Sequence, residues 1–115
     1  MGTLCISTTD FLGQTVVLTE RCRQEKSVKH PELNDSDFID LIRKAIARPH
    51  FVYEDFALPK RRWIYYLKKA RASSPNRYTK VVILIVGSRM VITAYEVDFV
   101  KEHHKKCKLI HGRYV

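Results

Sequence analysis

The chain has 115 residues, which is the length of a single domain. Its composition, 45% hydrophobic and 29% charged with 4 glycines and 4 prolines, excludes collagen-like, repeat and disordered proteins. With 21 lysines and arginines against 12 aspartates and glutamates, the net charge is +9, which suggests a polyanionic partner but does not bear on the fold.

The cysteines and histidines predict neither a disulfide scaffold nor a metal site. Cys5, Cys22 and Cys107 are widely spaced and form no C-x-x-C pair, so we expect free thiols in a reducing cytoplasm. The histidines lack the spacing of a helical ligand pair, and no metal or cofactor is expected. The longest apolar run, residues 81–87, is too short to span a membrane. We therefore expect a soluble, cytoplasmic protein with no membrane partner.

The N-terminal half of the chain predicts two helices. Residues 1–14 carry little periodicity and are expected to be an irregular start to a single domain over residues 15–115. Residues 15–18 suggest a short strand, and the polar stretch that begins at Thr19 suggests a surface helix with Thr19 as its N-cap.

A second helix is predicted more strongly by its apolar residues. Asn34, Asp35 and Ser36 are all suitable N-cap residues, and Pro49 should end the helix at about Arg48. Between them one apolar stripe recurs with helical spacing, formed by Phe38, Leu41, Ile42, Ala45 and Ile46.

The second half of the chain changes to the two-residue period of strands. Strands are predicted over residues 51–55, 62–69, 78–86 and 90–96. A short helix within 98–108 and a last edge strand over 107–111 are also compatible with the pattern. The predicted fold is α+β, with N-terminal helices packed on one face of a four- to five-stranded antiparallel sheet. The other face is then free to carry a site.

The positive charge is concentrated on the sheet half. Residues 1–31 sum to +1, residues 32–59 to −3 and residues 60–115 to +11. In residues 60–71, KRRWIYYLKKAR, six cations interleave with aromatic residues, a pattern that suits phosphates and stacked bases. A solvated basic edge strand is the alternative interpretation. The candidate nucleic-acid contacts are Arg61, Arg62, Lys68, Lys69, Arg77 and Lys80.

His30 and Glu32 are the first candidates for acid–base chemistry. They lie in the segment KHPEL just before the stronger helix, where Pro31 biases His30 away from helical geometry. Histidine is the side chain best matched to proton transfer near neutral pH, and Glu32 could orient the imidazole or act as a base. Alternatively, both residues simply organise the entry to the helix.

Strand alternation adds a second group of candidates. Thr93 and Tyr95 share one face of their predicted strand, and Tyr66, Arg62 and Lys68 could converge on the same sheet surface. Cations would stabilise a phosphate that gains charge, and hydroxyl groups would donate to its oxygens. Alternation alone does not determine the registers between strands, so this convergence is a hypothesis.

The order of these segments resembles a known superfamily. The chain resembles small phage- and mobile-element-associated nuclease-like domains of the barnase–EndoU–colicin–RelE superfamily. The resemblance lies in an H-P-E segment before an amphipathic helix, followed by the strand RRWIYYLKK and then by YTKVVILIV and VITAYE. The similarity covers about residues 15–97. It implies N-terminal helices on a four- or five-stranded antiparallel sheet.

The resemblance also implies an activity, which is RNA cleavage without a metal, by attack of the 2′-hydroxyl on the neighbouring phosphate. His30 would be the base or acid, and the groups that bind or polarise the phosphate would be Tyr66, Lys68, Thr93 and Tyr95. Such domains often act as toxins, so an acidic antitoxin or immunity protein is an expected partner beside RNA. The alternative is a non-catalytic module on the same fold that binds nucleic acid or protein.

Overall fold

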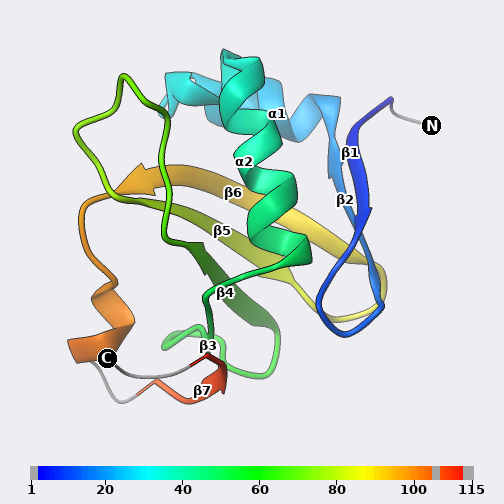
Figure 1. Ribbon diagram of the computed structural model, residues 1–115. Coiled ribbons are helices and arrows are strands. Elements are labelled where there is room, and N and C mark those ends of the chain that lie inside the picture. The colour runs from blue at the N-terminus through cyan, green and yellow to red at the C-terminus, as the bar shows by residue number, and fades with distance from the viewer. Residues whose placement is uncertain (1–2, 105–106, 113–115) are drawn as a thin grey trace.

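A seven-stranded sheet forms the body of the protein (Figure 1). The computed structural model describes residues 3–104 and 107–112. The strands are β1 (Leu4–Thr9), β2 (Thr15–Thr19), β3 (Phe51–Glu54), β4 (Arg62–Leu67), β5 (Tyr78–Leu84), β6 (Arg89–Val97) and β7 (Leu109–His111). The helices are α1 (Glu20–Ser27) and α2 (Ser36–Ala47), with short 3₁₀ helices η1 (Pro31–Asn34) and η2 (Lys101–His104). No helix in these described ranges is long and apolar enough to cross a membrane.

The α+β class is confirmed, whereas the predicted sheet is wrong in size and type. The strand order is β1-β2-β6-β5-β4-β3-β7, and all neighbours are antiparallel except β2 and β6, which are parallel. The parallel contact is short, because only Val16 with Arg89 and Val17 with Met90 are paired. The sheet is therefore mixed, with seven strands in place of the four or five that were expected.

The expectation of an irregular start over residues 1–14 is also wrong, because β1 and β2 form a hairpin. In β1 only Ile6 is buried, so this strand lacks the apolar alternation that would reveal it. Its hairpin is held at the tip by the buried carboxylate of Asp10. That carboxylate accepts hydrogen bonds from the backbone N–H groups of Leu12 and Gln14 and from the Tyr65 hydroxyl, at 3.0, 2.9 and 2.9 Å. Long-range contacts of this kind are not visible in local sequence.

Both predicted helices are present, with the expected caps. The Thr19 hydroxyl accepts from the Cys22 backbone N–H at 3.1 Å, and α1 has no buried residue, as its polar sequence predicted. The N-cap of α2 is Asp35, whose carboxylate accepts from the Asp37 N–H at 2.9 Å. All five residues of the predicted apolar stripe of α2 are buried.

The two faces of the sheet have different cover. On one face, α2 lies across the sheet and joins the main hydrophobic core with side chains such as Tyr65, Val81 and Ile83 (Figure 1). The opposite face, which we call the open face, carries Ile64, Tyr66 and Val82, and there the described part of the C-terminal segment contributes Val100, Cys107 and the partly buried Leu109. The open face is therefore only partly covered.

Removing one side chain of the α2 stripe should test this core. Ile42→Ala deletes a fully buried side chain and should lower the free energy of unfolding by about 2–5 kcal/mol, measured by urea denaturation. Val28→Ala, at a position 89% exposed, is the control and should change it by less than about 0.5 kcal/mol. Equal effects of the two substitutions would contradict the assignment of the core.

Candidate functional site

The candidate site lies where β2 and β6 separate. Beyond their two paired positions, the edge of β6 that faces β2 forms its hydrogen bonds with side chains of helical segments rather than with a strand. The thiol of Cys22 in α1 lies 3.5 and 3.3 Å from the carbonyl oxygens of Val91 and Ile92. Further along β6, the Glu96 N–H donates to a carboxylate oxygen of Glu32 in η1 at 3.1 Å. These contacts hold α1 and η1 beside the strand that carries Thr93 and Tyr95.

His30, the residue before η1, stacks on Tyr95. Their ring centroids are 4.4 Å apart and the rings are nearly parallel, with an interplanar angle of 11°. Burial lowers the pKa of His30 below its ordinary value of 6.5; the charge of Glu32 opposes this shift, and Lys29 and Lys26 reinforce it. The imidazole is therefore neutral at pH 7 and able to accept a proton.

The strand registers bring a row of side chains together on the open face. Tyr66 of β4 pairs with Lys80 of β5, and Lys80 pairs with Tyr95 of β6. The ammonium of Lys80 lies 5.7 Å from the ring centroid of Tyr66 and 5.4 Å from that of Tyr95. The adjacent row places Val82 opposite Thr93. Of the five side chains predicted to converge, Tyr66, Thr93 and Tyr95 share this surface and Arg62 lines a hollow over it, whereas Lys68 lies beyond the end of β4 and does not join them.

Two hollows meet at Thr93 and Tyr95. One, of about 610 Å³, lies toward α1 and includes Lys26, Lys29 and His30. The other, of about 200 Å³, lies over the open face and includes Arg62, Lys80 and Glu102. Among the described residues, the buried hydroxyl oxygen of Thr93 has no hydrogen-bond partner. Thr93 therefore lines both hollows with a hydroxyl group whose hydrogen-bonding capacity is unused.

Three basic residues, Arg62, Lys80 and Lys101, line the smaller hollow, and the first two have acidic partners. Arg62 Nε lies 2.9 Å from a carboxylate oxygen of Asp55. Lys80 Nζ lies 3.5 Å from a carboxylate oxygen of Glu102, and the Tyr66 hydroxyl is 2.7 and 2.8 Å from the two oxygens of the same carboxylate. Sequence reasoning missed Glu102, because its place on the sheet depends on a C-terminal segment without strand or helix periodicity.

The other predicted nucleic-acid contacts are exposed and lie away from this row. Arg61 precedes β4, whereas Lys68 and Lys69 follow it, so these cations lie at opposite ends of the strand. The ammonium of Lys68 is 5.2 Å from the ring centroid of Phe51. Arg77 precedes β5. The structure thus gathers Arg62 and Lys80 in one hollow and leaves these four cations in the flanking loops.

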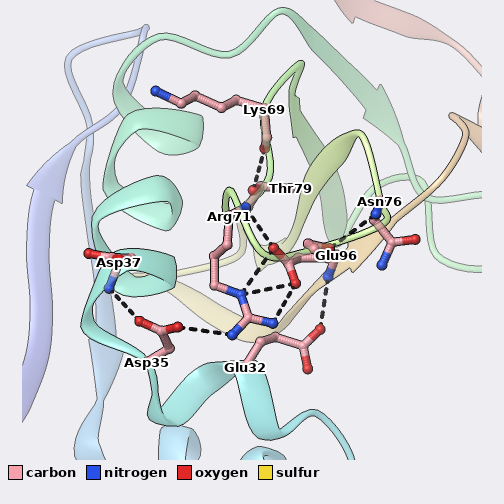
Figure 2. A network of polar contacts seen from close by, with 9 residues as sticks. Glu32, Asp35, Asp37, Lys69, Arg71, Asn76, Thr79 and Glu96 are labelled. Carbon is pink, nitrogen blue, oxygen red and sulfur yellow. Dashed lines mark hydrogen bonds and ion pairs between the residues drawn. The ribbon is translucent and has the colours of Figure 1, made fainter.

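Glu32 belongs to a polar network centred on Arg71 (Figure 2). The guanidinium of Arg71 binds the carboxylate of Glu96 at 2.8 Å and that of Asp35 at 2.9 Å. The Arg71 backbone N–H also donates to Glu96, at 2.8 Å. Figure 2 shows the guanidinium between the two carboxylates, with Glu32 reaching the backbone of Glu96 from below. The loop between β4 and β5 is thereby tied to α2 and to β6.

The network favours the charged forms of its members. Burial opposes ionisation of Glu96, but its hydrogen bonds from the Arg71 side chain and backbone outweigh this and lower its pKa. The hydrogen bond from Arg71, followed by that from the Asp37 N–H, lowers the pKa of Asp35. Sequence reasoning treated Arg71 only as one of six cations in a basic stretch, and no local pattern marks its two partners.

Comparison with known proteins adds no relative: no family model, no curated protein and no solved structure matches the chain. Within residues 3–104 and 107–112, no group of three or more histidine, cysteine, aspartate or glutamate side chains is placed to hold a metal ion.

Substitution of Arg71 should measure the strength of the network. Arg71→Met leaves Glu96, whose side chain is 2% exposed, without its cation and should cost about 2–4 kcal/mol of unfolding free energy at pH 7. The Glu96 pKa is lowered in the folded state, so this stabilisation is complete above its ordinary value of 4.5 and is lost as the pH falls through the folded value.

Urea denaturation at pH 7 and at low pH checks this prediction. Arg43→Met is the matched control, because Arg43 pairs with Asp40 on an exposed helix surface and its loss should cost less than about 1 kcal/mol. A similar loss for both variants, or a loss for Arg71→Met that does not shrink at low pH, would contradict the assigned role of the network.

Proposed function

We propose that the chain is a ribonuclease that cleaves RNA by attack of a 2′-hydroxyl on the neighbouring phosphate. The observation that carries the proposal is the stacking of His30 on Tyr95 beside two hollows that meet at Thr93. A neutral imidazole is suited to accept a proton near pH 7. The resemblance of the sequence to nuclease-like domains supports the same reaction.

In the proposed reaction His30 is the general base. It takes the proton from the 2′-hydroxyl, whose oxygen then forms a bond to phosphorus while the bond from phosphorus to the 5′-oxygen breaks. Water in the hollow gives a proton to the departing 5′-oxygen, and the hydroxide so formed takes the proton back from His30, which restores the neutral imidazole. The products are a 2′,3′-cyclic phosphate and a 5′-hydroxyl end. This mechanism balances without a redox partner or a metal.

The side chains around His30 have supporting roles in this proposal. The hydroxyl groups of Thr93 and Tyr95 hold the phosphate oxygens, and Arg62 and Lys80 offset the charge that develops on them. Glu32 acts as a positioning residue, because its carboxylate binds the β6 backbone one residue beyond Tyr95. It thereby holds η1, and His30 before it, against the strand.

The exposed cations favour a second candidate function, which is RNA binding without cleavage. Arg61, Lys68, Lys69 and Arg77 are all exposed in loops at the ends of β4 and β5. Such cations can track a phosphate backbone whether or not the chain cleaves it. They are also a suitable surface for an acidic inhibitor protein, the partner that the sequence resemblance implies.

Cleavage of single-stranded RNA in excess EDTA tests the proposal. The wild-type protein should produce 2′,3′-cyclic phosphate ends, identified by mass spectrometry of the products. His30→Ala should lower the cleavage rate by about 10²–10⁴-fold, because it removes the general base. Binding of the same RNA should be retained, since the exposed cations are unchanged.

His50→Asn is the matched control for this substitution. His50 is exposed and its Nδ1 accepts from the Lys68 N–H at 3.0 Å, a bond that an asparagine side chain can replace. The control should cleave at the wild-type rate. Equal rates for His30→Ala and wild type would remove His30 from the mechanism, and intact but bound RNA would favour the second candidate function.

A further inference from the structure

The proposed reaction leaves one buried acid on the open face without a role. Glu102 belongs to η2, and its side chain is 4% exposed. Its two carboxylate oxygens face the Tyr66 hydroxyl, at 2.7 and 2.8 Å, and one of them is 3.5 Å from Lys80 Nζ. The C-terminal segment therefore places a carboxylate at the centre of the sheet surface that also carries Tyr95.

The groups that face Glu102 form a receptor for an anion. Lys80 is 7% exposed and contacts the rings of Tyr66 and Tyr95. Burial, together with the nearby charge of Glu102, raises the pKa of Tyr66 far above its ordinary value, so this hydroxyl keeps its proton and acts as a donor. A buried ammonium requires a compensating anion, and a hydroxyl donor beside it sets where the anion's oxygens lie.

The Lys80 side of this receptor opens into the smaller hollow, whereas Tyr66 is fully buried and is not part of the lining. Lys80 and Glu102 line this hollow together with Arg62, Thr93 and Tyr95. A phosphodiester group carries one negative charge over two non-bridging oxygens, as the Glu102 carboxylate does over its two oxygens, and it can accept hydrogen bonds from the same donors. Replacement of one anion by another would leave Lys80 compensated, so the exchange avoids the cost of an unpaired buried cation.

We propose that Tyr66 and Lys80 form a phosphate subsite, and that Glu102 occupies this subsite as an internal substitute for phosphate. That the phosphate belongs to RNA rests on the function proposed above. The occupied form is a self-inhibited state, because an RNA phosphate enters the subsite only when the Glu102 side chain turns away. RNA binding and release of Glu102 are therefore coupled.

The surroundings of η2 allow this movement of a single side chain. His103, the next residue, packs edge-on against Phe51 and Tyr53 of β3, with ring centroids 4.8 and 5.5 Å apart. Val100 is buried against the same side of the sheet. These contacts hold η2 on β3 independently of Glu102, so the carboxylate can leave the subsite while the segment stays in place.

Thermal melting in inorganic phosphate tests the subsite without requiring catalysis. Glu102→Gln removes the internal anion and keeps the size of the side chain. Its melting temperature should rise by several degrees, roughly 4–8 °C, between zero and saturating phosphate at constant ionic strength, because phosphate binds only the folded state. The wild-type protein should shift by less than a quarter of that amount, since Glu102 already fills the subsite.

Two variants control for general effects of charge and of burial. Glu96→Gln removes another buried carboxylate, one that pairs with Arg71 and does not line the hollow, and it should not respond to phosphate. Lys80→Met combined with Glu102→Gln removes the cation of the subsite and should abolish the response. A Glu102→Gln protein that folds only in phosphate would support the proposal.

Several outcomes would overturn the subsite. These are a Glu102→Gln protein that melts at the same temperature at every phosphate concentration, one that stays unfolded even in phosphate, and a response shared equally by Glu96→Gln. Any of them would make Glu102 a structural tie between η2 and the sheet.

RNA cleavage by the same variant separates this inference from the proposed function. If both hold, Glu102→Gln cleaves RNA faster than the wild type because no internal anion competes with the RNA phosphate for the subsite. A phosphate response without cleavage by any variant would keep the subsite and reject the ribonuclease. Cleavage that depends on His30, without a phosphate response in Glu102→Gln, would keep the ribonuclease and reject the subsite.

Discussion

The arrangement of the site depends on one arginine, Arg71, which sits between two carboxylates. Its guanidinium joins Asp35, the cap of α2, to Glu96 on β6, across the loop between β4 and β5. Glu32 completes the connection by accepting from the Glu96 backbone N–H. Because the parallel pairing of β2 with β6 stops after two positions, this network, rather than a neighbouring strand, ties η1 to the exposed edge of β6. The stacking of His30 on Tyr95 follows from that tie.

The open face differs from a simple basic surface. Its central cations, Arg62 and Lys80, both have carboxylate partners, and the exposed cations lie in the loops around them. In the proposed mechanism the loops attract RNA by long-range charge, whereas the centre accepts a phosphate only by exchanging it for Glu102. In this proposal the loops attract RNA and the centre of the open face carries out the reaction, a division that the net charge alone does not reveal.

The sequence predicted those features that arise from local periodicity. The stripe of α2, both helix caps and the four central strands follow from residue spacing and were confirmed. The β1 strand and the parallel contact were missed, since each depends on residues far apart in the chain. In the site, alternation correctly placed Thr93 and Tyr95 on one face, but it could not reveal that Glu102 lies against Tyr66 or that Arg71 organises the loop.

The pKa of His30, followed by NMR titration of its ring protons, tests the central claim most directly. In the wild type it should lie below 6.5, because burial against Tyr95 disfavours the charged imidazole. In Arg71→Met, which removes the bridge between Asp35 at the end of η1 and Glu96 of β6, it should return toward 6.5. A wild-type value at or above 6.5, or one that Arg71→Met leaves unchanged, would contradict the account.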